Sequence, residues 1–442
     1  MTNAHRVELL AKIDERTVHV GVIGLGYVGL PLALTFVETG VKVTGFDVDP
    51  YKIEKLSRGE TYIMHMDPTR IARAVHDRLF DATTDFNRLS EPDVLLIAVP
   101  TPLTRQREPE MKYVVMTSHQ IKERLRPGQL VVLESTTYPG TTDELVRGIL
   151  EESGLKCGKD FFLAFSPERE DPGNRHFNTK TIPKVVGGVD VDAGDVAEKL
   201  YGIAISSVVR VSTARTAEAS KLTENIFRAV NIALANELKV VYDQMGIDVW
   251  EVLDAAATKP FGFMKFSPGP GLGGHCIPLD PFYLTWKARE YGVSTRFIEL
   301  SGEVNVSMPR YVIDKLQLAL NDRGVPLKNA KVIVLGLAYK NDIDDPRESP
   351  SFELINILLE RGANVSYHDP HIPTSPRMRA WPHLPPMESV ALTDDVISGA
   401  DVLLISTNHT AVDYDRIAKL AKLVVDTRGV YRRGPLHNVV KA

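Results

Sequence analysis

A glycine-rich turn between a buried strand and a helix is the feature that most constrains the fold of this 442-residue chain. The segment VHVGVIGLGYVG, residues 18–29, reads as an apolar strand running into the turn, and the helical stretch LPLALTFVETG follows. A second strand, VKVTGFDVDP, ends at Asp47. This order of strand, glycine turn, helix and strand with a terminal carboxylate predicts a βαβ unit that binds a dinucleotide.

The residue types in the turn suit the phosphates of such a ligand. Gly24 permits the tight turn, Gly26 lets the backbone approach a pyrophosphate, and Gly29 allows the helix to pack closely on the strand. Tyr27 and Val28 complete the turn before the helix N-terminus, where unpaired amides attract anions. The turn is therefore the predicted pyrophosphate site.

Polar residues at three strand ends extend this cofactor site. The carboxylate of Asp47 suits the free ribose hydroxyls of NAD and would repel the extra phosphate of NADP, and FAD is a weaker alternative. The apolar strands of PDVLLIAVPTP and QLVVLESTTYPGTT run into turns that contain Thr101 and Thr136–Thr137. Ligands of open α/β sheets bind at such carboxyl ends. These threonines could equally be ordinary turn residues.

The same pattern returns late in the chain. AKVIVLGLAYK, residues 330–340, repeats VHVGVIGLGYV, and NVSYHDPH, ADVLLISTNHT and KLVVDTRG repeat the three later strands in the same order. We therefore expect an α/β fold with two doubly wound, Rossmann-like domains. Ala338 replaces the middle glycine of the second turn and Lys340 follows it, so this domain is expected to bind a different nucleotide.

A long helix is predicted between the two repeats. Residues 213–245 contain neither Gly nor Pro, and the helix is long enough to bridge two domains or to pair with a second subunit. Its apolar stripe consists of Leu222, Ile226, Val230, Ala233 and Leu234. We expect an N-terminal domain at 1–205, a central helical domain at 206–320 and a C-terminal domain at 321–442.

Two polar residues share one face of this helix. Lys221 and Asn225 are four residues apart, next to the apolar stripe. On the helix alone, a solvated lysine paired with Glu218 or Glu224 is the more ordinary interpretation. A nucleophile opposite would change it, because ammonium and amide groups are donors that stabilise an alkoxide or an oxyanion.

One of the two cysteines stands in a segment that favours chemistry. In GPGLGGHCIPLDPFYL, residues 269–284, Cys276 follows three close-set glycines, among them Gly273, and precedes Asp280. Such glycines let a substrate approach the main chain. Cys157 fits an inert buried thiol, whereas Cys276 fits a thiolate that attacks a carbonyl. His275 could lower the pKa of that thiol and stays unassigned.

Glu168 is a further candidate, at the end of the apolar strand FFLAF in the segment AFSPERED. An exposed surface glutamate is the ordinary interpretation of this residue. A general base that activates water is the functional one, because the carboxylate would lie at a strand end beside the cofactor domain.

Composition narrows the setting. The net charge of −5 gives no support over the whole chain for nucleic-acid binding. Two cysteines cannot build a disulfide framework, and no CxxC or HExxH spacing predicts a metal. No apolar run approaches the roughly 18 residues of a membrane span, and the first residues lack an apolar signal core. We expect a cytoplasmic protein without membrane contact.

Several long motifs, in one order, resemble the UDP-glucose/GDP-mannose dehydrogenase family over roughly residues 18–435. They are GVIGLGYVGLPLA, STTYPGTT, SPEREDPGN, EASKLTEN, GPGLGGHCIPLDP, GLAYKNDIDDPRES and DTRGV. The version GGHCIPLDPFYL, together with SPER, is most similar to the UDP-N-acetylglucosamine 6-dehydrogenase branch.

The resemblance implies that two NAD⁺ oxidise the C6 alcohol of a UDP-sugar to a uronic acid without release of the aldehyde. Cys276 would capture the aldehyde as a thiohemiacetal, which becomes a thioester that water hydrolyses. UDP-N-acetylglucosamine is the leading substrate, and UDP-glucose, UDP-N-acetylgalactosamine and UDP-N-acetylmannosamine stay open. The resemblance also implies a homodimer through the long helix and a place in bacterial surface polysaccharide synthesis.

The resemblance assigns catalytic roles by motif. Lys221 and Asn225 would hold the developing oxyanion. Asp280 would assist proton transfer through water, together with Lys221. Thr136 would order that water, and Glu168 would serve the hydrolysis.

Ligand contacts follow in the same way. Lys340 and Arg428 would bind the UDP portion, Arg347 would reach the NAD across the cleft, and Lys52 would touch the adenosine ribose or a phosphate. Lys265 is a candidate substrate contact.

The segment before the cysteine, KPFGFMKFSPGPG, departs from the family pattern. Members that act on UDP-glucose often carry basic residues there, and here only Lys259 and Lys265 are available. Two other functions stay open: a two-electron β-hydroxyacid dehydrogenase, and a nucleotide sensor without turnover. The second repeat and Cys276 disfavour the former, and the set of Cys, Lys, Asn and Asp residues disfavours the latter.

Overall fold

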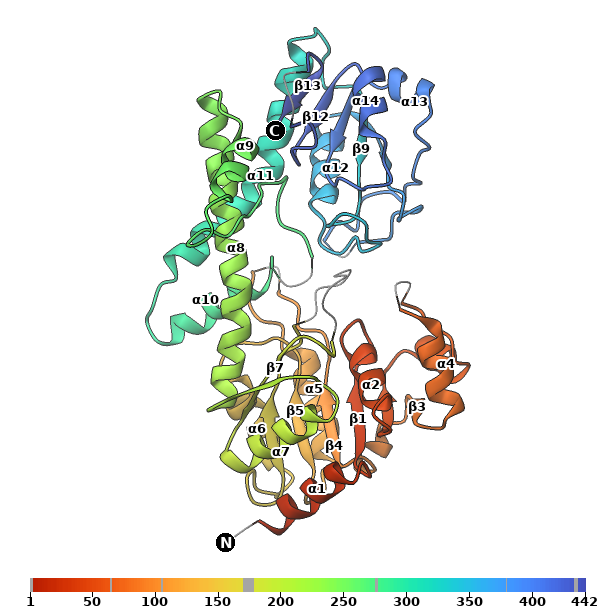
Figure 1. The fold of residues 1–442 in the computed structure, drawn as a ribbon, viewed down its shortest axis with the longest axis vertical. Coiled ribbons are helices and arrows are strands. Elements are labelled where there is room, and N and C mark those ends of the chain that lie inside the picture. Colours follow the sequence, from red (N-terminus) through yellow and green to blue (C-terminus); the bar gives the residue numbers. More distant parts are fainter. Residues whose placement is uncertain are drawn as a thin grey trace. The chain divides into compact units, whose positions relative to one another are not determined.

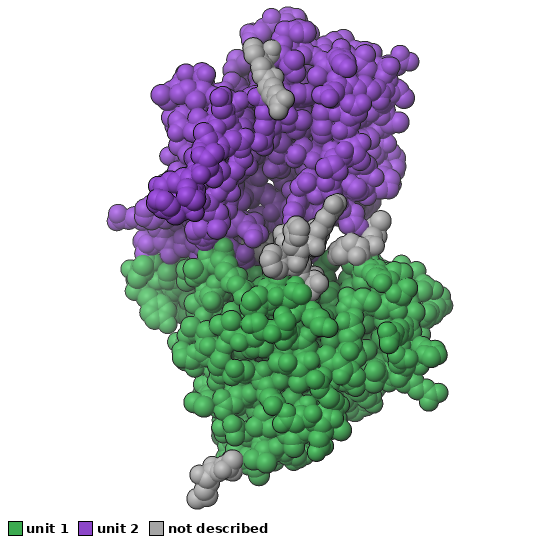
Figure 2. All heavy atoms as spheres, in the orientation of Figure 1, with its two compact units in different colours: residues 1–224, 282–293 green, residues 225–281, 294–442 purple. Residues whose placement is uncertain are grey.

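The computed structural model describes residues 3–63, 66–104, 106–169, 179–274, 277–378, 380–432 and 436–442. The chain divides into two compact units (Figure 2). The first comprises residues 1–224 and 282–293, and the second comprises residues 225–281 and 294–442. Within the described ranges, no helix combines the length and the hydropathy that crossing a membrane requires.

The first unit is built on an eight-stranded sheet in the order β3-β2-β1-β4-β5-β6-β7-β8 (Figure 1). Its strands are β1 (His19–Ile23), β2 (Lys42–Phe46), β3 (Phe80–Thr83), β4 (Val94–Ile97), β5 (Leu130–Leu133), β6 (Phe162–Phe165), β7 (Lys184–Gly188) and β8 (Val208–Val211). All neighbouring strands are parallel except β6 and β7, which pair antiparallel.

Apolar side chains cover both faces of this sheet. In β4, Val94 and Leu96 belong to one buried cluster, and Leu95 and Ile97 belong to another. Because successive side chains of a strand point to opposite faces, a run such as VLLI fills two cores at once. The helices of this unit are α1 (Ala4–Asp14), α2 (Gly29–Val37), α3 (Pro50–Ser57), α4 (Pro68–His76), α5 (Lys112–Lys122), α6 (Arg147–Glu151) and α7 (Val191–Gly202), with the short helices η1 (Phe86–Ser90) and η2 (Thr141–Val146).

The second unit holds a five-stranded parallel sheet in the order β10-β9-β11-β12-β13. Its strands are β9 (Lys331–Leu335), β10 (Asn364–His368), β11 (Val402–Ile405), β12 (Val424–Asp426) and β13 (Val439–Lys441). The four repeated segments thus form β2-β1-β4-β5 in one sheet and β10-β9-β11-β12 in the other, in the same spatial order. The predicted fold, two Rossmann-like domains with a helical region between them, is confirmed.

The helical region is dominated by two long helices (Figure 1). The bounds of α8 are Ala214–Gln244, close to the predicted 213–245. The second long helix is α11 (Arg296–Asn321). The other helices after α8 are α9 (Val249–Ala256), α10 (Asp280–Glu290), α12 (Pro350–Glu360), α13 (Asp394–Gly399) and α14 (Tyr414–Leu420). Leu234, expected in the apolar stripe of α8, is 53% exposed, and small or polar residues such as Ala229 and Asn236 are buried instead. The interior here is therefore more polar than the stripe predicted.

A buried glutamate anchors the first turns of α8 to the start of η2 in the first unit. Glu218 is fully buried, and its carboxylate accepts from the amides of Gly140 (2.6 Å) and Thr142 (2.9 Å) and from the Thr142 hydroxyl (2.7 Å). These amides stand at the start of η2, where a helix leaves its donors unpaired. Burial raises the pKa of Glu218 to about 7, against the effect of the three donors.

Replacing Glu218 by glutamine removes this titration. The ordinary carboxyl pKa is 4.5 and the folded-state pKa is about 7, so the folded protein binds the proton more tightly. The stabilisation is full below the unfolded-state pKa and is lost as the pH rises through the folded-state pKa. Between about pH 5 and about pH 8, calorimetry is expected to show wild type losing about 2.5 kcal/mol of stability relative to Glu218→Gln.

The matched control for this measurement is Glu123→Gln, because the side chain of Glu123 is 56% exposed. This variant is expected to follow the pH dependence of wild type. A difference between wild type and Glu218→Gln that stays constant with pH would mean that the three donors hold the carboxylate ionised.

Candidate functional site

The glycine turn of the first unit is held against the neighbouring strand β4. Gly24 has φ 94°, and its amide donates to the carbonyl of Phe46 (2.7 Å). A Cβ at Gly24 would lie 2.5 Å from the carbonyl oxygen of Ala98, whereas a Cβ at Gly26 would meet nothing within 4 Å. The side of the turn at Gly26 is thus open, and this fits the approach of a pyrophosphate to the backbone.

A carboxylate ties this turn to the end of β2. Asp47 is 6% exposed; its Oδ2 accepts from the amide of Leu25 (2.9 Å) and from Lys52 Nζ (2.8 Å). Its Oδ1 accepts from the amide of Asp49 (3.0 Å). The structure therefore brings Asp47 and Lys52 together beside the turn. Tyr27, in the turn itself, is 42% exposed.

The loops after β4 and β5 are linked through their threonines. The hydroxyl of Thr101 donates to the carbonyl of Thr136 (2.8 Å), and Ser135 Oγ donates to the carbonyl of Val99 (2.7 Å). The carbonyl of Thr101 in turn accepts from the hydroxyl of Tyr283 (2.5 Å). The two threonines predicted at these strand ends are thus adjacent, and the hydroxyl of Thr101 fixes the loop that carries Thr136.

Lys221 and Asn225 on α8 are both 7% exposed. Asn225 Nδ2 donates to Asp280 Oδ2 (2.5 Å), so these two predicted catalytic residues are in direct contact. Within the part of the chain that the structure describes, the ammonium of Lys221 has no hydrogen-bond or ion-pair partner.

The ordinary interpretation of Lys221, a solvated lysine paired with Glu218 or Glu224, is therefore wrong. Glu218 binds the amides of η2, and Glu224 pairs with Arg169 (2.8 Å). Neither expected partner is engaged with Lys221, which is left as a buried donor.

The cysteine segment is described only on either side of its centre. Cys276 and His275 lie outside the described residues. A Cβ at Gly269 would lie 2.7 Å from Arg428 Nη1, and one at Gly273 would lie 2.6 Å from Tyr339 Cβ. The glycines therefore admit side chains of the C-terminal domain, where the sequence led us to expect room for a substrate. A main-chain contact of Gly273 with substrate stays a prediction.

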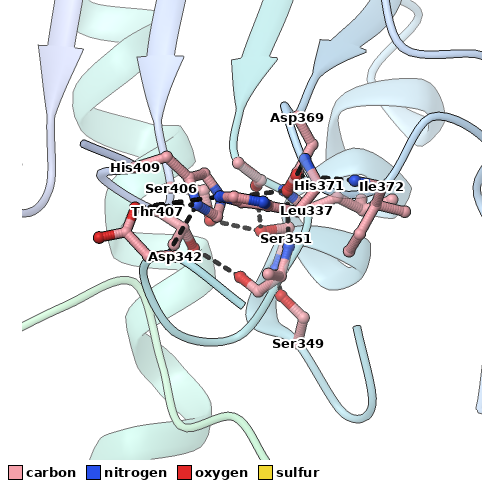
Figure 3. A network of polar contacts seen from close by, with 12 residues as sticks. Leu337, Asp342, Ser349, Ser351, Asp369, His371, Ile372, Ser406, Thr407 and His409 are labelled. Atoms are coloured by element: carbon pink, nitrogen blue, oxygen red, sulfur yellow. Dashed lines mark hydrogen bonds and ion pairs between the residues drawn. The ribbon is translucent and has the colours of Figure 1, made fainter. Parts of the chain in front are cut away.

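The glycine turn after β9 is built like the first turn, and Figure 3 shows polar contacts around it. Gly336 has φ 87°, and its amide donates to the carbonyl of His368 (2.8 Å). Asp369, 3% exposed, accepts from the amides of Leu337 (2.6 Å) and Ala338 (3.0 Å). Burial raises the pKa of Asp369, but His409 and the amides lower it further, to about 2.

His409 connects this carboxylate to the loop beyond the turn (Figure 3). Its Nε2 lies 3.1 Å from Asp369 Oδ2, and its Nδ1 accepts from the amide of Asp342 (3.0 Å). Because an amide can only donate, the proton of the ring is assigned to Nε2. Oxygen or nitrogen atoms of Asp342, His371 and His409 lie within 4.8 Å of one another, a set that could hold a metal ion. The hydrogen bond at Nδ1 occupies the lone pair that a metal would need.

The sequence did not single out Asp369, Asp342 or His409. The signal for Asp369 was present, since NVSYHDPH repeats the strand that ends at Asp47. His409 stands in the repeated segment ADVLLISTNHT, and Asp342 stands in the motif GLAYKNDIDDPRES. Their contact could not be predicted, because it depends on the ends of separate strands meeting at one edge of the sheet.

The predicted cations of the second unit have protein partners. Arg428 Nε donates to the carbonyl of Ser406 (2.6 Å), and burial lowers the pKa of Arg428 to about 10. Arg347 forms a two-point ion pair with Asp345, with N–O distances of 2.6 Å and 2.9 Å. Lys265 pairs with Asp254. Lys340 is half-buried at the end of the second turn.

Comparison with known proteins assigns the three parts of the chain. Residues 18–205 match the NAD-binding domain of the UDP-glucose/GDP-mannose dehydrogenase family, residues 215–307 match its central domain, and residues 333–433 match its UDP-binding domain.

Individual relatives cover most of the chain. A UDP-N-acetyl-D-glucosamine 6-dehydrogenase of Pseudomonas aeruginosa is 35% identical over 364 residues, 82% of this chain and 85% of the relative. An NDP-N-acetyl-D-galactosaminuronic acid dehydrogenase of Ralstonia solanacearum is 34% identical over 435 residues, 95% and 97% of the two chains. The solved structure of a UDP-D-ManNAc dehydrogenase from Pyrococcus horikoshii superposes with a TM-score of 0.85 at 32% identity, covering 96% of this chain and 98% of the other.

The fold and the three matches lead to the same assignment. The structure has two glycine turns of one build and a helical region that α8 dominates, and each part matches a domain of one family. The chain belongs to the UDP-glucose/GDP-mannose dehydrogenase family and is an NAD-dependent UDP-sugar dehydrogenase.

Proposed function

We propose that this enzyme oxidises the C6 alcohol of a UDP-linked N-acetylhexosamine to the uronic acid in two successive oxidations at one site. The observation that carries the proposal is that the glycine turn occurs twice, with different residues where a nucleotide would bind. The first turn is open at Gly26 and has Asp47 beside it, whereas the second has Ala338 and Lys340. Two nucleotide-bearing molecules can therefore be bound by one chain.

Residues of the first turn would hold the NAD. Gly26 leaves the backbone free to approach the pyrophosphate, and Gly24 and Gly29 allow the tight turn and the close packing of the helix. Asp47 would accept hydrogen bonds from the hydroxyls of the adenosine ribose. Lys52, already 2.8 Å from Asp47, would lie next to that ribose. Tyr27, Val28, Thr101 and Arg347 complete the proposed cofactor contacts. When bound, NAD⁺ supplies the hydride acceptor for both oxidations.

The other residues hold the sugar and move its protons. The thiol of Cys276 adds to the C6 aldehyde, which gives a thiohemiacetal; loss of a further hydride and proton gives a thioester. Water then cleaves the C–S bond and leaves a carboxylate and the free thiol. Lys221 and Asn225 are donors for the oxyanion, and their burial strengthens that interaction because less water competes.

Proton transfer and hydrolysis need carboxylates. Asp280, in contact with Asn225 at 2.5 Å, would accept the alcohol proton through water. Thr136 would order the water through which Asp280 accepts this proton, and Glu168 would activate the hydrolytic water. Lys340, Arg428, Gly273 and Lys265 are the proposed contacts of the UDP-sugar, of which Lys265 would have to leave Asp254.

The reaction is expected to give two NADH for each sugar oxidised, with no free aldehyde, because the thioester retains the carbon between the two oxidations. Cys276→Ala is expected to lose turnover. Cys157→Ala is the matched control, since burial raises the pKa of the Cys157 thiol to about 12 and makes it unreactive. Absorbance at the nicotinamide band and chromatography of the sugar measure both quantities. One NADH per sugar with accumulating aldehyde would contradict the thioester route.

The leading substrate is UDP-N-acetylglucosamine. Two relatives and the solved structure are named for N-acetylglucosamine, N-acetylgalactosaminuronic acid and N-acetylmannosamine, which supports an acetamido group at C2 and leaves the sugar stereochemistry open. The segment before the cysteine also lacks most of the basic residues expected of enzymes acting on UDP-glucose.

Parallel assays of the four UDP-sugars with NAD⁺ and NADP⁺ test this choice. We expect the highest kcat/KM for UDP-N-acetylglucosamine with NAD⁺, because Asp47 would repel the extra phosphate of NADP⁺. UDP-glucose as the best substrate would overturn the acetamido assignment, and equal use of NADP⁺ would overturn the role of Asp47.

A homodimer through α8 is the proposed assembly. Phe227, Leu234 and Val241 are 49%, 53% and 47% exposed and recur every seven residues, so they form one apolar face. Exposed apolar side chains that recur along one face of a long helix favour a second copy as its partner. We place the enzyme in the cytoplasm, where a catalytic thiol is kept reduced.

Sedimentation equilibrium is expected to give a dimer for wild type and a shift towards monomer for Leu234→Lys. The control is Val7→Lys, because Val7 is 52% exposed on α1, outside the proposed interface. A wild-type monomer, or a Leu234→Lys dimer as stable as wild type, would contradict the proposal.

A further inference from the structure

A buried group of charges lies beside Glu168, and none of the steps above uses it. Lys184, the first residue of β7, is 4% exposed, and Glu134, at the end of β5, is 1% exposed. The ammonium of Lys184 is 2.6 Å from Glu134 Oε2 and 3.4 Å from Glu168 Oε2. Charges this deep lose their hydration, so the protein must compensate each of them.

One cation serves two carboxylates in this group. Burial lowers the pKa of Lys184, but Glu134 and Glu168 raise it above its ordinary value, so the lysine stays charged. Burial raises the pKa of Glu134, against the effect of Lys184 and of the Tyr201 hydroxyl. Glu134 and Glu168 therefore compete for the charge of a single ammonium, 2.6 Å and 3.4 Å away.

The position of the ammonium is fixed by the fold. The Lys184 amide donates to the carbonyl of Ser207 (2.9 Å), which holds β7 in the sheet. The side chain passes the ring of Tyr201, with Nζ 5.3 Å from its centroid, and Nζ also donates to the carbonyl of Pro167 (3.3 Å). Because Pro167 precedes Glu168, the lysine holds both the backbone and the carboxylate of this segment.

We propose that Lys184 is a positioning residue for Glu168, and that Glu134, by sharing the same ammonium, sets how firmly the Glu168 carboxylate is held in its ionised form. The inference rests on the proposed function, in which Glu168 activates the water that cleaves the thioester. Removal of Lys184 takes away the ammonium that both carboxylates contact. Glu168 then takes up a proton at higher pH and loses the orientation that a general base needs.

Pre-steady-state kinetics of the full-length enzyme separates this role from a general structural one. Lys184→Met is expected to release two NADH per active site in a burst and then turn over about 10- to 100-fold more slowly than wild type, because only hydrolysis is impaired. Lys184→Arg, which keeps the cation, is expected to restore most of the rate. Lys12→Met is the control, since Lys12 forms an ion pair with Asp93 (3.0 Å), which directly precedes β4 in the same unit.

The pH dependence of hydrolysis gives a second, independent readout. The acidic limb is expected to move to higher pH in Lys184→Met and to lower pH in Glu134→Gln, where Glu168 has the ammonium to itself. A Lys184→Met enzyme that slows the first hydride transfer equally, or that shows no burst, overturns the proposal. If Lys184→Met does not fold, an unchanged acidic limb in Glu134→Gln overturns it. A single NADH per sugar in wild type would instead refute the proposed function.

Discussion

The structure depends on one hydrogen bond that occurs twice, from the amide after a turn glycine to the carboxylate at the end of the next strand. In the first domain Leu25 donates to Asp47 (2.9 Å), and in the second Leu337 donates to Asp369 (2.6 Å). A buried carboxylate that accepts amides fixes the turn without filling it with a side chain. In the first domain the backbone at Gly26 thereby stays clear of side chains.

The two copies then diverge in what surrounds this bond. Asp47 keeps one oxygen close to Lys52, at a turn that is open at Gly26. Asp369 is surrounded by amides and by His409, which leaves no side of it for a ribose. One copy is therefore suited to recognise a ribose through its carboxylate, whereas for the other we propose that the nucleotide is bound through Lys340 and Arg428. A single duplicated βαβ unit can in this way serve two different ligands.

Features that depend on local pattern were predictable from the sequence, and features that depend on distant contacts were not. The strands, both glycine turns and α8 follow from apolar runs, glycines and helical spacing. The exposure of Leu234 and the packing of Gly273 against Tyr339 do not, because each requires knowing which segment lies opposite. The same holds for Lys221, which has no partner among the described residues. The same holds for Lys184, which meets Glu134 only when β5, β6 and β7 are aligned in one sheet.

The proposed reaction depends on the sulfur of Cys276 carrying the oxidised sugar. A Glu168→Gln enzyme, given NAD⁺ and the UDP-sugar that it oxidises fastest, would be quenched in acid and digested. Mass spectrometry of the peptide with Cys276 is predicted to show the added mass of the acyl sugar nucleotide. An unmodified peptide from an enzyme that has formed two NADH per site would contradict the account.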